Sequence, residues 1–201
     1  IRRIEGKLPL KLTQNFNKFK KKHIKKPLDV ATRQASEMVI NTISSLLPEL
    51  VGGSADLTGS NNTKGGKMEV INSTNYNGNY IYYGIREHGM ASIMNGLSLH
   101  KGIIPFGGTF LIFLDYCKPS LRLAALMKQR AIYILTHDSI GLGEDGPTHQ
   151  PIEQLASLRA TPNVKVFRPA DLIETAEAWE LALSNSKGPS VIALTRQKLP
   201  M

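Results

Sequence analysis

The sequence predicts an α/β fold with a doubly wound, mostly parallel sheet that has helices on both faces. Two features of the chain lead to this prediction. Segments with the apolar spacing of helices alternate with short segments typical of strands, and most of the strand segments are continuous apolar runs. A continuously apolar strand is buried on both of its faces, which is the situation of a parallel sheet covered by helices. The 201 residues are enough for one domain of this kind.

The predicted helices have apolar residues three or four positions apart. In the first of them, Ala35, Val39 and Ile43 fall on one face, and Pro48 ends the pattern. We expect helices over residues 32–47, 87–99, 110–129, 152–159 and 172–183. Pro119 lies inside the third of these helices, which it should kink or divide.

The predicted strands are short runs that are rich in β-branched and aromatic residues. They cover residues 49–53, 80–83, 102–106, 131–135, 164–167 and 190–194. The strand at 102–106 should end in a turn at Gly107 and Gly108. The stretch 58–79 should be a long loop, because it is rich in Gly, Ser, Asn and Thr.

The positive charge of the chain is concentrated at its start. Residues 1–30 contain ten lysines and arginines against Glu5 and Asp29, which is a net charge of +8 out of +9 for the whole chain. We interpret residues 1–27 as a basic linker or lead-in, a solvated connecting segment, and residues 28–201 as the folded domain. A basic run can bind nucleic acid, but this one contains no recognisable reading motif, so we expect no nucleic-acid partner.

Cysteine content and hydropathy indicate the compartment. The single cysteine, Cys117, excludes an internal disulfide and fits a reducing environment, so we expect a cytoplasmic protein. No run of about 18 apolar residues is present, so we expect no membrane association.

The stretch 137–151 is the strongest indication of a functional site. It follows the predicted strand 131–135 and contains two histidines, three acids and three glycines. Ligands of open parallel sheets bind beyond the carboxyl ends of the strands. We therefore expect His137 at that edge of the sheet, with Asp145 and His149 presented to the same crevice by the loop.

This stretch, HDSIGLGEDGPTHQP, resembles a signature of the transketolases, which are thiamine-diphosphate enzymes. Five other stretches resemble motifs of the same family and occur in the family's order. They are ATRQAS at 31–36, GGSADLTGSN at 52–61, GIREHGM at 84–90, GGTFLIF at 107–113 and ALTRQKLP at 193–200. The resemblance covers nearly all of the chain from about residue 28 and implies a thiamine-diphosphate pyrimidine-binding domain.

The resemblance implies a reaction in which a two-carbon ketol unit moves between ketose and aldose phosphates in the pentose phosphate pathway. Its cofactors would be thiamine diphosphate and a divalent cation, Mg²⁺ or Ca²⁺. The Gly-Asp-Gly motif that holds the metal-bound diphosphate in this family is absent from the chain, as is the family's C-terminal domain. We therefore expect no metal ligands here, and a site completed by the metal-binding and diphosphate-binding domain of a partner subunit in a homodimer.

Two expectations follow from this partial coverage. The isolated chain should be inactive, because it would supply only half of a site. The missing initiator methionine and the end soon after the last motif favour a piece of a longer enzyme over a natural subunit.

The resemblance assigns residues to the cofactor. Glu87 would bind a ring nitrogen of the aminopyrimidine and favour the tautomer needed for catalysis; without the resemblance it would be a first-turn acid favoured by the helix dipole. Phe113, with Phe110 and Tyr116 behind it, would wall the same ring, and their spacing predicts one helix face. Gly107 and Gly108 would allow a planar ligand to approach. Asp56 matches a position close to the cofactor.

The resemblance also assigns residues to the sugar substrate. Those matching the phosphate-binding positions are Arg33, Ser60, His137 and Arg196. Guanidinium groups and hydroxyls are suitable donors to phosphate oxygens. Asp145 and His149 match positions that bind sugar hydroxyls and assist proton transfer, so His149 joins Glu87 as a catalytic candidate.

Two alternatives stay open at this stage. The chain could be a non-catalytic binding or assembly module, or the pyrimidine domain of another thiamine-diphosphate enzyme, such as one of the pyruvate dehydrogenase or deoxyxylulose phosphate synthase type. The segments GGSADLT and GEDGPTHQP favour the transketolases over these enzymes.

Overall fold

The computed structural model describes all 201 residues and contains a six-stranded parallel sheet. Its strands are β2 (Leu50–Ser54), β3 (Tyr80–Tyr82), β4 (Ile104–Phe110), β5 (Ile132–Thr136), β6 (Lys165–Phe167) and β7 (Ser190–Ala193). They lie in the order β3-β2-β4-β5-β7-β6. The ends of the observed strands differ from the predicted ends by no more than four residues. The continuous apolar runs therefore predicted the strands well.

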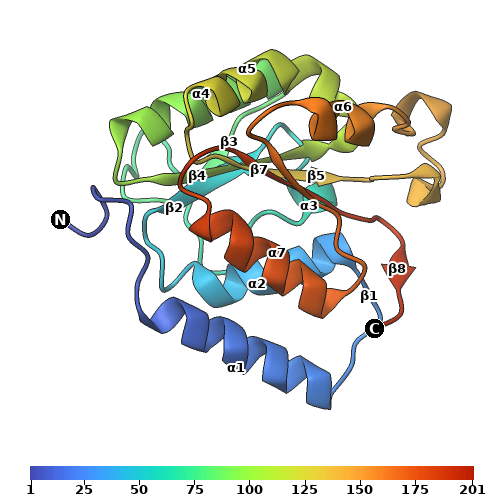
Figure 1. Cartoon of the computed structure of the whole chain (residues 1–201), viewed down its shortest axis with the longest axis horizontal. Coiled ribbons are helices and arrows are strands. Elements are labelled where there is room, and N and C mark those ends of the chain that lie inside the picture. Colours follow the sequence, from blue (N-terminus) through green and yellow to red (C-terminus); the bar gives the residue numbers. More distant parts are fainter.

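Helices cover both faces of the sheet (Figure 1). They are α1 (Lys11–Lys25), α2 (Thr32–Ile43), α3 (Thr58–Asn61), α4 (Glu87–His100), α5 (Leu114–Leu126), α6 (Gln154–Ala160) and α7 (Leu172–Ser184). In Figure 1, α4, α5 and α6 lie on one side of the sheet, and α1, α2 and α7 lie on the other. The doubly wound α/β fold predicted from the sequence is confirmed.

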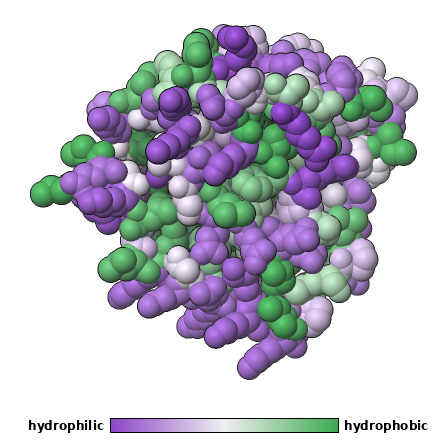
Figure 2. Space-filling view, in the orientation of Figure 1, coloured by the Kyte–Doolittle hydropathy of each residue, from purple (hydrophilic) through white to green (hydrophobic).

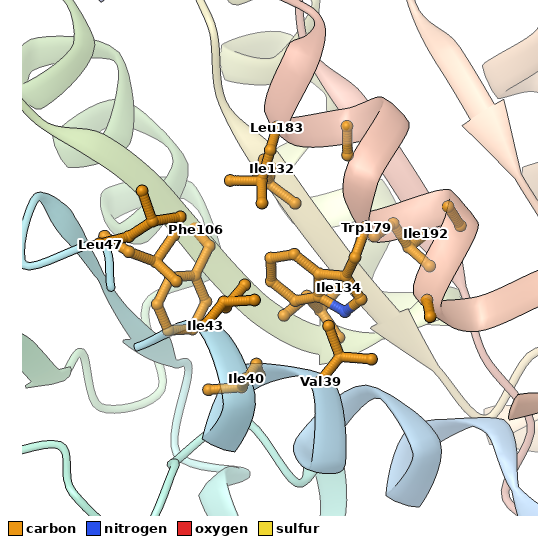
Figure 3. Packing of buried hydrophobic residues seen from close by; sticks show 14 of the residues in the cluster. Val39, Ile40, Ile43, Leu47, Phe106, Ile132, Ile134, Trp179, Leu183 and Ile192 are labelled. Atoms are coloured by element: carbon orange, nitrogen blue, oxygen red, sulfur yellow. The ribbon is translucent and has the colours of Figure 1, made fainter. Parts of the chain in front are cut away.

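Each face of the sheet has its own apolar core. On the side of α2 and α7, Trp179 packs between the two helices and the sheet, with Phe106 edge-on at a ring-centroid distance of 6.2 Å (Figure 3). The indole Nε1 of Trp179 donates a hydrogen bond to Ser36 Oγ at 2.8 Å, so its only polar atom is paired although the side chain is fully buried. On the other side, α4 and α5 pack through a second cluster that includes Met90, Met94 and Cys117.

The order of the strands creates a switch point between β2 and β4. The chain runs from β2 to β3 on one side of it, and then returns to place β4 on the other side. In sheets of this type a crevice opens at such a point, beyond the carboxyl ends of the strands. Here those ends are Ser54 of β2 and Phe110 of β4, and the neighbouring strand β5 ends at Thr136.

The basic segment at the start of the chain differs from our expectation of a solvated connection. It contains the 15-residue helix α1, which buries Leu12, Phe16, Phe19 and His23 on one face. Lys20 contacts Glu180 of α7 at 3.3 Å, and Arg2 contacts Glu49 at 2.6 Å. The remaining lysines of α1 are exposed, and Figure 2 shows hydrophilic side chains over this part of the surface. The helix is therefore amphipathic and packs on the domain.

Strand β4 corrects the predicted turn at Gly107 and Gly108, because both residues continue the strand to Phe110. A Cβ atom at Gly107 would collide with the sulfur of Met94, and one at Gly108 would lie 2.6 Å from Thr63 Cγ2. The two glycines make room for neighbouring side chains of the protein.

The segment after β4 begins differently from the predicted helix 110–129. Phe110 ends the strand, residues Leu111–Phe113 form a 3₁₀ turn, and α5 starts only at Leu114. Pro119 lies inside α5 without dividing it.

Several short elements were not predicted from the sequence. Helix α3 forms inside the expected loop 58–79, and β1 (Val30–Ala31) pairs antiparallel with β8 (Lys198–Leu199) near the end of the chain. None of the helices combines the length and the apolar character that a membrane crossing requires.

Candidate active site

His137 is a buried residue of the site at the carboxyl end of the sheet. It directly follows β5, with its backbone in the left-handed region (φ 58°), and only 2% of its surface is exposed. Its ring stacks on Phe110 at a centroid distance of 3.7 Å, and its Nδ1 lies 2.8 Å from Thr136 Oγ1. A left-handed histidine costs on the order of 1–3 kcal/mol, so these contacts hold a conformation that the backbone alone disfavours.

The surroundings of His137 keep its imidazole neutral. Burial, followed by the positive charge of Arg33, lowers the pKa of His137 to about 4, while the carboxylate of Asp145 acts in the opposite direction. Arg196 and His149 also lower this pKa. The distance of 3.9 Å between His137 Nε2 and Asp145 Oδ2 is therefore not that of an ion pair near neutral pH.

Two arginines from distant parts of the sequence meet beside this histidine. Arg33 lies in the first turn of α2, and its Nη1 donates a hydrogen bond of 2.6 Å to the backbone oxygen of Ser60 in α3. Burial, followed by the charge of Arg196, lowers the pKa of Arg33. The charges of Asp145 and Glu144 act in the opposite direction. Guanidinium groups are suitable donors to an anion such as phosphate. The hydroxyl of Ser60 has no hydrogen-bond partner in the chain.

Reciprocal hydrogen bonds place Arg196 at this position. Thr195 N donates to Thr32 Oγ1 at 2.7 Å, and Thr32 N donates to Thr195 Oγ1 at 3.0 Å. These bonds join the segment after β7 to the start of α2. The guanidinium of Arg196 also donates to the carboxylate of Glu144 in the loop that contains the two histidines.

The three predicted aromatic residues form a continuous wall at the end of β4. Phe110 and Phe113 are stacked with an angle of 4° between their rings and 5.7 Å between centroids, and Phe113 contacts Tyr116 at 5.8 Å. His149 meets Phe113 edge-on at 5.4 Å, so the loop 137–151 folds back on this wall. The rings do not share a helix face as predicted, because only Tyr116 lies in α5.

Glu87 starts α4 on the side of the sheet where α5 packs. Only 8% of its surface is exposed, and its carboxylate makes no hydrogen bond or ion pair within the chain. It acts on Cys117 of α5: burial, followed by the charge of Glu87, raises the pKa of this thiol to about 12. The carboxylate oxygens of Glu87 are not among the fully buried atoms that lack a partner, so they are open to a ligand or a protein group from outside the chain.

An aminopyrimidine fits these residues. The flat face of its ring could lie against the aromatic wall. Its ring nitrogen could form a hydrogen bond with the carboxyl group of Glu87, which has no such bond within the chain. Asp56, the remaining cofactor candidate, lies in an exposed loop after β2 with φ at 58°, and its side chain contacts none of the other candidates through a hydrogen bond or ion pair.

No group of three or more His, Cys, Asp or Glu side chains is arranged so that it could hold a metal ion. Three surface cavities of about 100 to 340 Å³ lie elsewhere, and none is lined by a candidate site residue.

The family model for the pyrimidine-binding domain of transketolase matches residues 29–201. The chain belongs to the transketolase family. This confirms the resemblance to transketolases seen in the sequence motifs.

Individual transketolases show how much of the family's length the chain represents. Transketolase from Sinorhizobium medicae is 60% identical over 184 residues, which are 92% of this chain and 26% of that protein. The solved structure of Pichia stipitis transketolase in complex with sedoheptulose-7-phosphate superposes with a TM-score of 0.92 and 44% identity, over 100% of this chain and 30% of that one. The chain thus spans less than a third of these transketolases.

A smaller transketolase chain is also similar. The solved structure of a split-gene transketolase, described as an inactive β4 tetramer, has a TM-score of 0.69 and 29% identity, and it matches 87% of this chain and 54% of that one.

Sequence reasoning missed one set of polar residues beneath the site. They are Tyr80, Thr63, Ser54, Asn61 and Thr136, all buried and linked in this order by hydrogen bonds. Small polar residues are common in turns and strands, so only their contacts across the fold single them out.

Proposed function

We propose that this chain is the pyrimidine-binding part of a transketolase that transfers a two-carbon ketol unit from a ketose phosphate to an aldose phosphate in the pentose phosphate pathway. The observation that carries this proposal is the meeting of Arg33, His137 and Arg196 beside the wall of Phe110 and Phe113. An anion-binding group and a flat aromatic surface at one sheet edge suit a phosphorylated sugar next to a heteroaromatic cofactor.

The phosphate of the sugar would bind at the two arginines. Both guanidinium groups offer paired N–H donors whose geometry fits phosphate oxygens, and the free hydroxyl of Ser60 would add a further donor. The bond from Arg33 to the backbone of Ser60 supports this assignment, because it holds α3 next to the arginines. His137 would complete the pocket from the end of β5.

Glu87 would act on the cofactor. Thiamine diphosphate, when bound, would supply the nucleophilic carbon for ketol transfer, and Glu87 and the aromatic wall would hold its aminopyrimidine. The Glu87 carboxyl would share a proton with the ring nitrogen and so favour the tautomer needed for catalysis. Phe113 would orient the ring, with Phe110 and Tyr116 behind it.

His149 and Asp145 would serve the reacting carbons of the sugar. Both belong to the loop that folds over the aromatic wall, and His149 touches the rings of Phe110 and Phe113. An imidazole at this place can bind a sugar hydroxyl and move its proton, while Asp145 would accept a hydrogen bond from a neighbouring hydroxyl.

The metal ion and the diphosphate would be held by another domain, in a partner subunit of a homodimer. Two observations support this proposal. The carboxylate of Glu87 has no partner within the chain, and two large side chains near it are exposed to solvent, Ile85 at 80% and Tyr116 at 64%. The inactive state described for the split-gene relative supports the further proposal that this chain alone has no activity.

The test uses a hybrid enzyme in which this chain replaces the matching part of Sinorhizobium medicae transketolase. In this hybrid enzyme, Arg33→Ala and Arg196→Ala should each raise KM for sedoheptulose 7-phosphate by roughly ten- to 150-fold, because each removes a charge-assisted hydrogen bond of about 1.5–3 kcal/mol. The kinetics with unphosphorylated sedoheptulose should change little, since this sugar lacks the group that the arginines bind.

Arg159→Ala is the matched control, because Arg159 is exposed on α6, outside the site. It should leave both substrates unaffected. Equal losses with the two sugars in the Arg33 and Arg196 variants would remove the phosphate pocket from this part of the molecule. A hybrid that assembles but transfers no ketol group would favour the non-catalytic assembly module.

A further inference from the structure

The loop 137–151 places a carboxylate on one of the arginines that the proposed function assigns to the substrate's phosphate. Glu144 accepts a hydrogen bond from the guanidinium of Arg196, and the two groups form an ion pair. Glu144 makes no other side-chain hydrogen bond or ion pair within the chain. A guanidinium group offers the same N–H donors to a carboxylate and to a phosphate. Glu144 and a phosphate therefore compete for Arg196.

The charges of this part of the site balance with Glu144 in its position. Arg33 and Arg196 carry two positive charges, and two carboxylates lie close to them. The carboxylates are those of Asp145 and Glu144, and both counteract the lowering of the Arg33 pKa by burial and by Arg196. A phosphate ester carries between one and two negative charges near neutral pH. Its entry beside both carboxylates would leave an excess of negative charge, so one carboxylate has to move away.

Glu144 is the carboxylate that can move. Glu144 and Asp145 are the central residues of a turn, which is closed by a hydrogen bond of 3.3 Å from Gly146 N to Gly143 O. Both glycines have positive φ angles, 87° at Gly143 and 75° at Gly146, so the turn lies between two residues with a wide conformational range. The side chain of Glu144 is 73% exposed, whereas that of Asp145 is 33% exposed. Glu144 can therefore leave Arg196 for solvent without uncovering the core.

The packing of the neighbouring residues supports this contact independently of the ion pair. A Cβ atom at Gly143 would lie 3.4 Å from Arg196 Nη1, and one at Gly141 would lie 2.7 Å from the side-chain Cδ of Gln197. The backbone of the loop thus lies directly against residues 196 and 197, and glycine at these two positions allows the close approach.

We propose that Glu144 is a specificity-determining residue, which holds the place of the substrate's phosphate on Arg196 and is displaced when a phosphorylated sugar binds. The proposal rests on the phosphate pocket of Arg33, His137 and Arg196 proposed above, and it adds a competitor to that pocket. The observed affinity for a phosphorylated sugar is then the intrinsic affinity of the pocket, reduced by the strength of the pair that must be broken. A sugar without a phosphate does not displace Glu144, so its affinity is not reduced.

The first test measures the binding of inorganic phosphate to the full 201-residue chain. The chain is labelled with ¹⁵N, and the Nε–H signal of Arg196 is followed as phosphate is added; the signal that Arg196→Lys removes gives the assignment. Glu144→Gln keeps the size of the side chain but removes its charge. It should lower the dissociation constant of phosphate about two- to fivefold, the range expected for the loss of an exposed ion pair.

Glu153→Gln is the matched control. Glu153 is an exposed glutamate just beyond the loop and makes no ion pair, so its substitution removes the same charge without freeing an arginine. The dissociation constant of phosphate should stay at the wild-type value. Equal gains in the Glu144 and Glu153 variants would overturn the proposal, because they would reduce the effect to the overall charge of the chain.

The second test measures kinetics in the hybrid enzyme. Glu144→Gln should lower KM for sedoheptulose 7-phosphate about two- to fivefold with kcat changed less than about twofold, and it should leave KM for unphosphorylated sedoheptulose unchanged. Combined with Arg196→Ala, it should have no further effect on either sugar, because the pair that it breaks is already absent. This double-mutant cycle assigns the gain to the contact between the two side chains.

The direction of the change decides between displacement and its opposite. A KM for sedoheptulose 7-phosphate that stays the same or rises in Glu144→Gln would overturn the displacement of Glu144. If Arg196→Ala still weakens only the phosphorylated sugar in that case, the proposed phosphate pocket stands without this competitor. If Arg196→Ala weakens both sugars alike and phosphate leaves the Arg196 signal unchanged, the phosphate pocket fails and the role of Glu144 fails with it.

Discussion

The low pKa of His137 predicts how the stability of this chain depends on pH, and the substitution His137→Asn isolates the effect. Asparagine is the appropriate replacement, because it tolerates the left-handed backbone of this position better than most residues do and does not titrate. The variant will differ from the wild type in absolute stability, since it loses the stacking contact with Phe110. The diagnostic quantity is therefore the change in stability with pH.

The magnitude follows from the difference between the folded and unfolded states. The pKa of His137 is lowered from 6.5 to about 4 in the folded chain, so the unfolded chain binds a proton more readily. Stability is fully present above pH 6.5 and is lost as the pH falls toward 4. With about 1.4 kcal/mol per pKa unit, the whole loss is about 3 kcal/mol, of which about 2 kcal/mol falls between pH 8 and pH 5.

Urea unfolding of the full chain at several pH values between 5 and 8 measures this effect. The free energy of unfolding of the wild type should fall about 2 kcal/mol further than that of His137→Asn over this interval. Titration of the His137 ring signals gives a direct check on the cause. Parallel pH profiles for the two proteins would refute the reasoning, because they would mean that His137 titrates alike in the folded and unfolded chains.

Three further predictions concern other parts of the molecule. In the hybrid enzyme, Glu87→Gln should lower kcat on the order of 10²–10⁴-fold with the fold intact, since the amide cannot share a proton with the cofactor; near-normal turnover would return Glu87 to a helix-start acid. Phe16→Ala should reduce the free energy of unfolding by about 3–5 kcal/mol, because Phe16 is 1% exposed in the core, and an effect below about 1 kcal/mol in urea would mean that α1 is not packed on the domain. Gly108→Ala should cost about 1–3 kcal/mol by overpacking, whereas an unchanged unfolding midpoint would contradict the packing of Thr63 and Ser54 against β4.

The sheet was predictable because its signal is local. Continuous apolar runs such as 131–135 are recognisable in the sequence itself, and most predicted boundaries lie close to the observed ones. Gly107 and Gly108 were misjudged because glycine usually indicates a turn. Glycine is needed at these positions because Met94 of α4 and Thr63 pack against β4, and this packing exists only in the folded chain.

Helix α1 was missed for a different reason. Leu12, Phe16, Phe19 and His23 have helical spacing, but the lysines between them dominated the interpretation of the segment as a solvated linker. Its amphipathic pattern was present in the sequence. What the sequence did not contain was the partner surface on α7 that makes the pattern stable.

The candidate site was also only partly predictable from the sequence. The loop 137–151 stood out by composition, whereas Arg33 and Arg196 were proposed only through the family resemblance, because an isolated arginine has the same appearance on any surface. The structure brings these residues together through the bonds between Thr32 and Thr195. The set of buried polar residues beneath the site was beyond prediction, since its members are ordinary polar residues whose contacts join sequence positions as distant as Asn61 and Thr136.

Ketol transfer by the hybrid enzyme tests the central claim most directly. The account predicts that the hybrid, supplied with thiamine diphosphate and Mg²⁺, forms product from sedoheptulose 7-phosphate and an aldose phosphate, and that the 201-residue chain alone forms none under the same conditions. Turnover by the purified chain alone would contradict the claim that it supplies half of a site. A hybrid that is folded, dimeric and loaded with cofactor, but transfers no ketol unit, would contradict the proposed function itself.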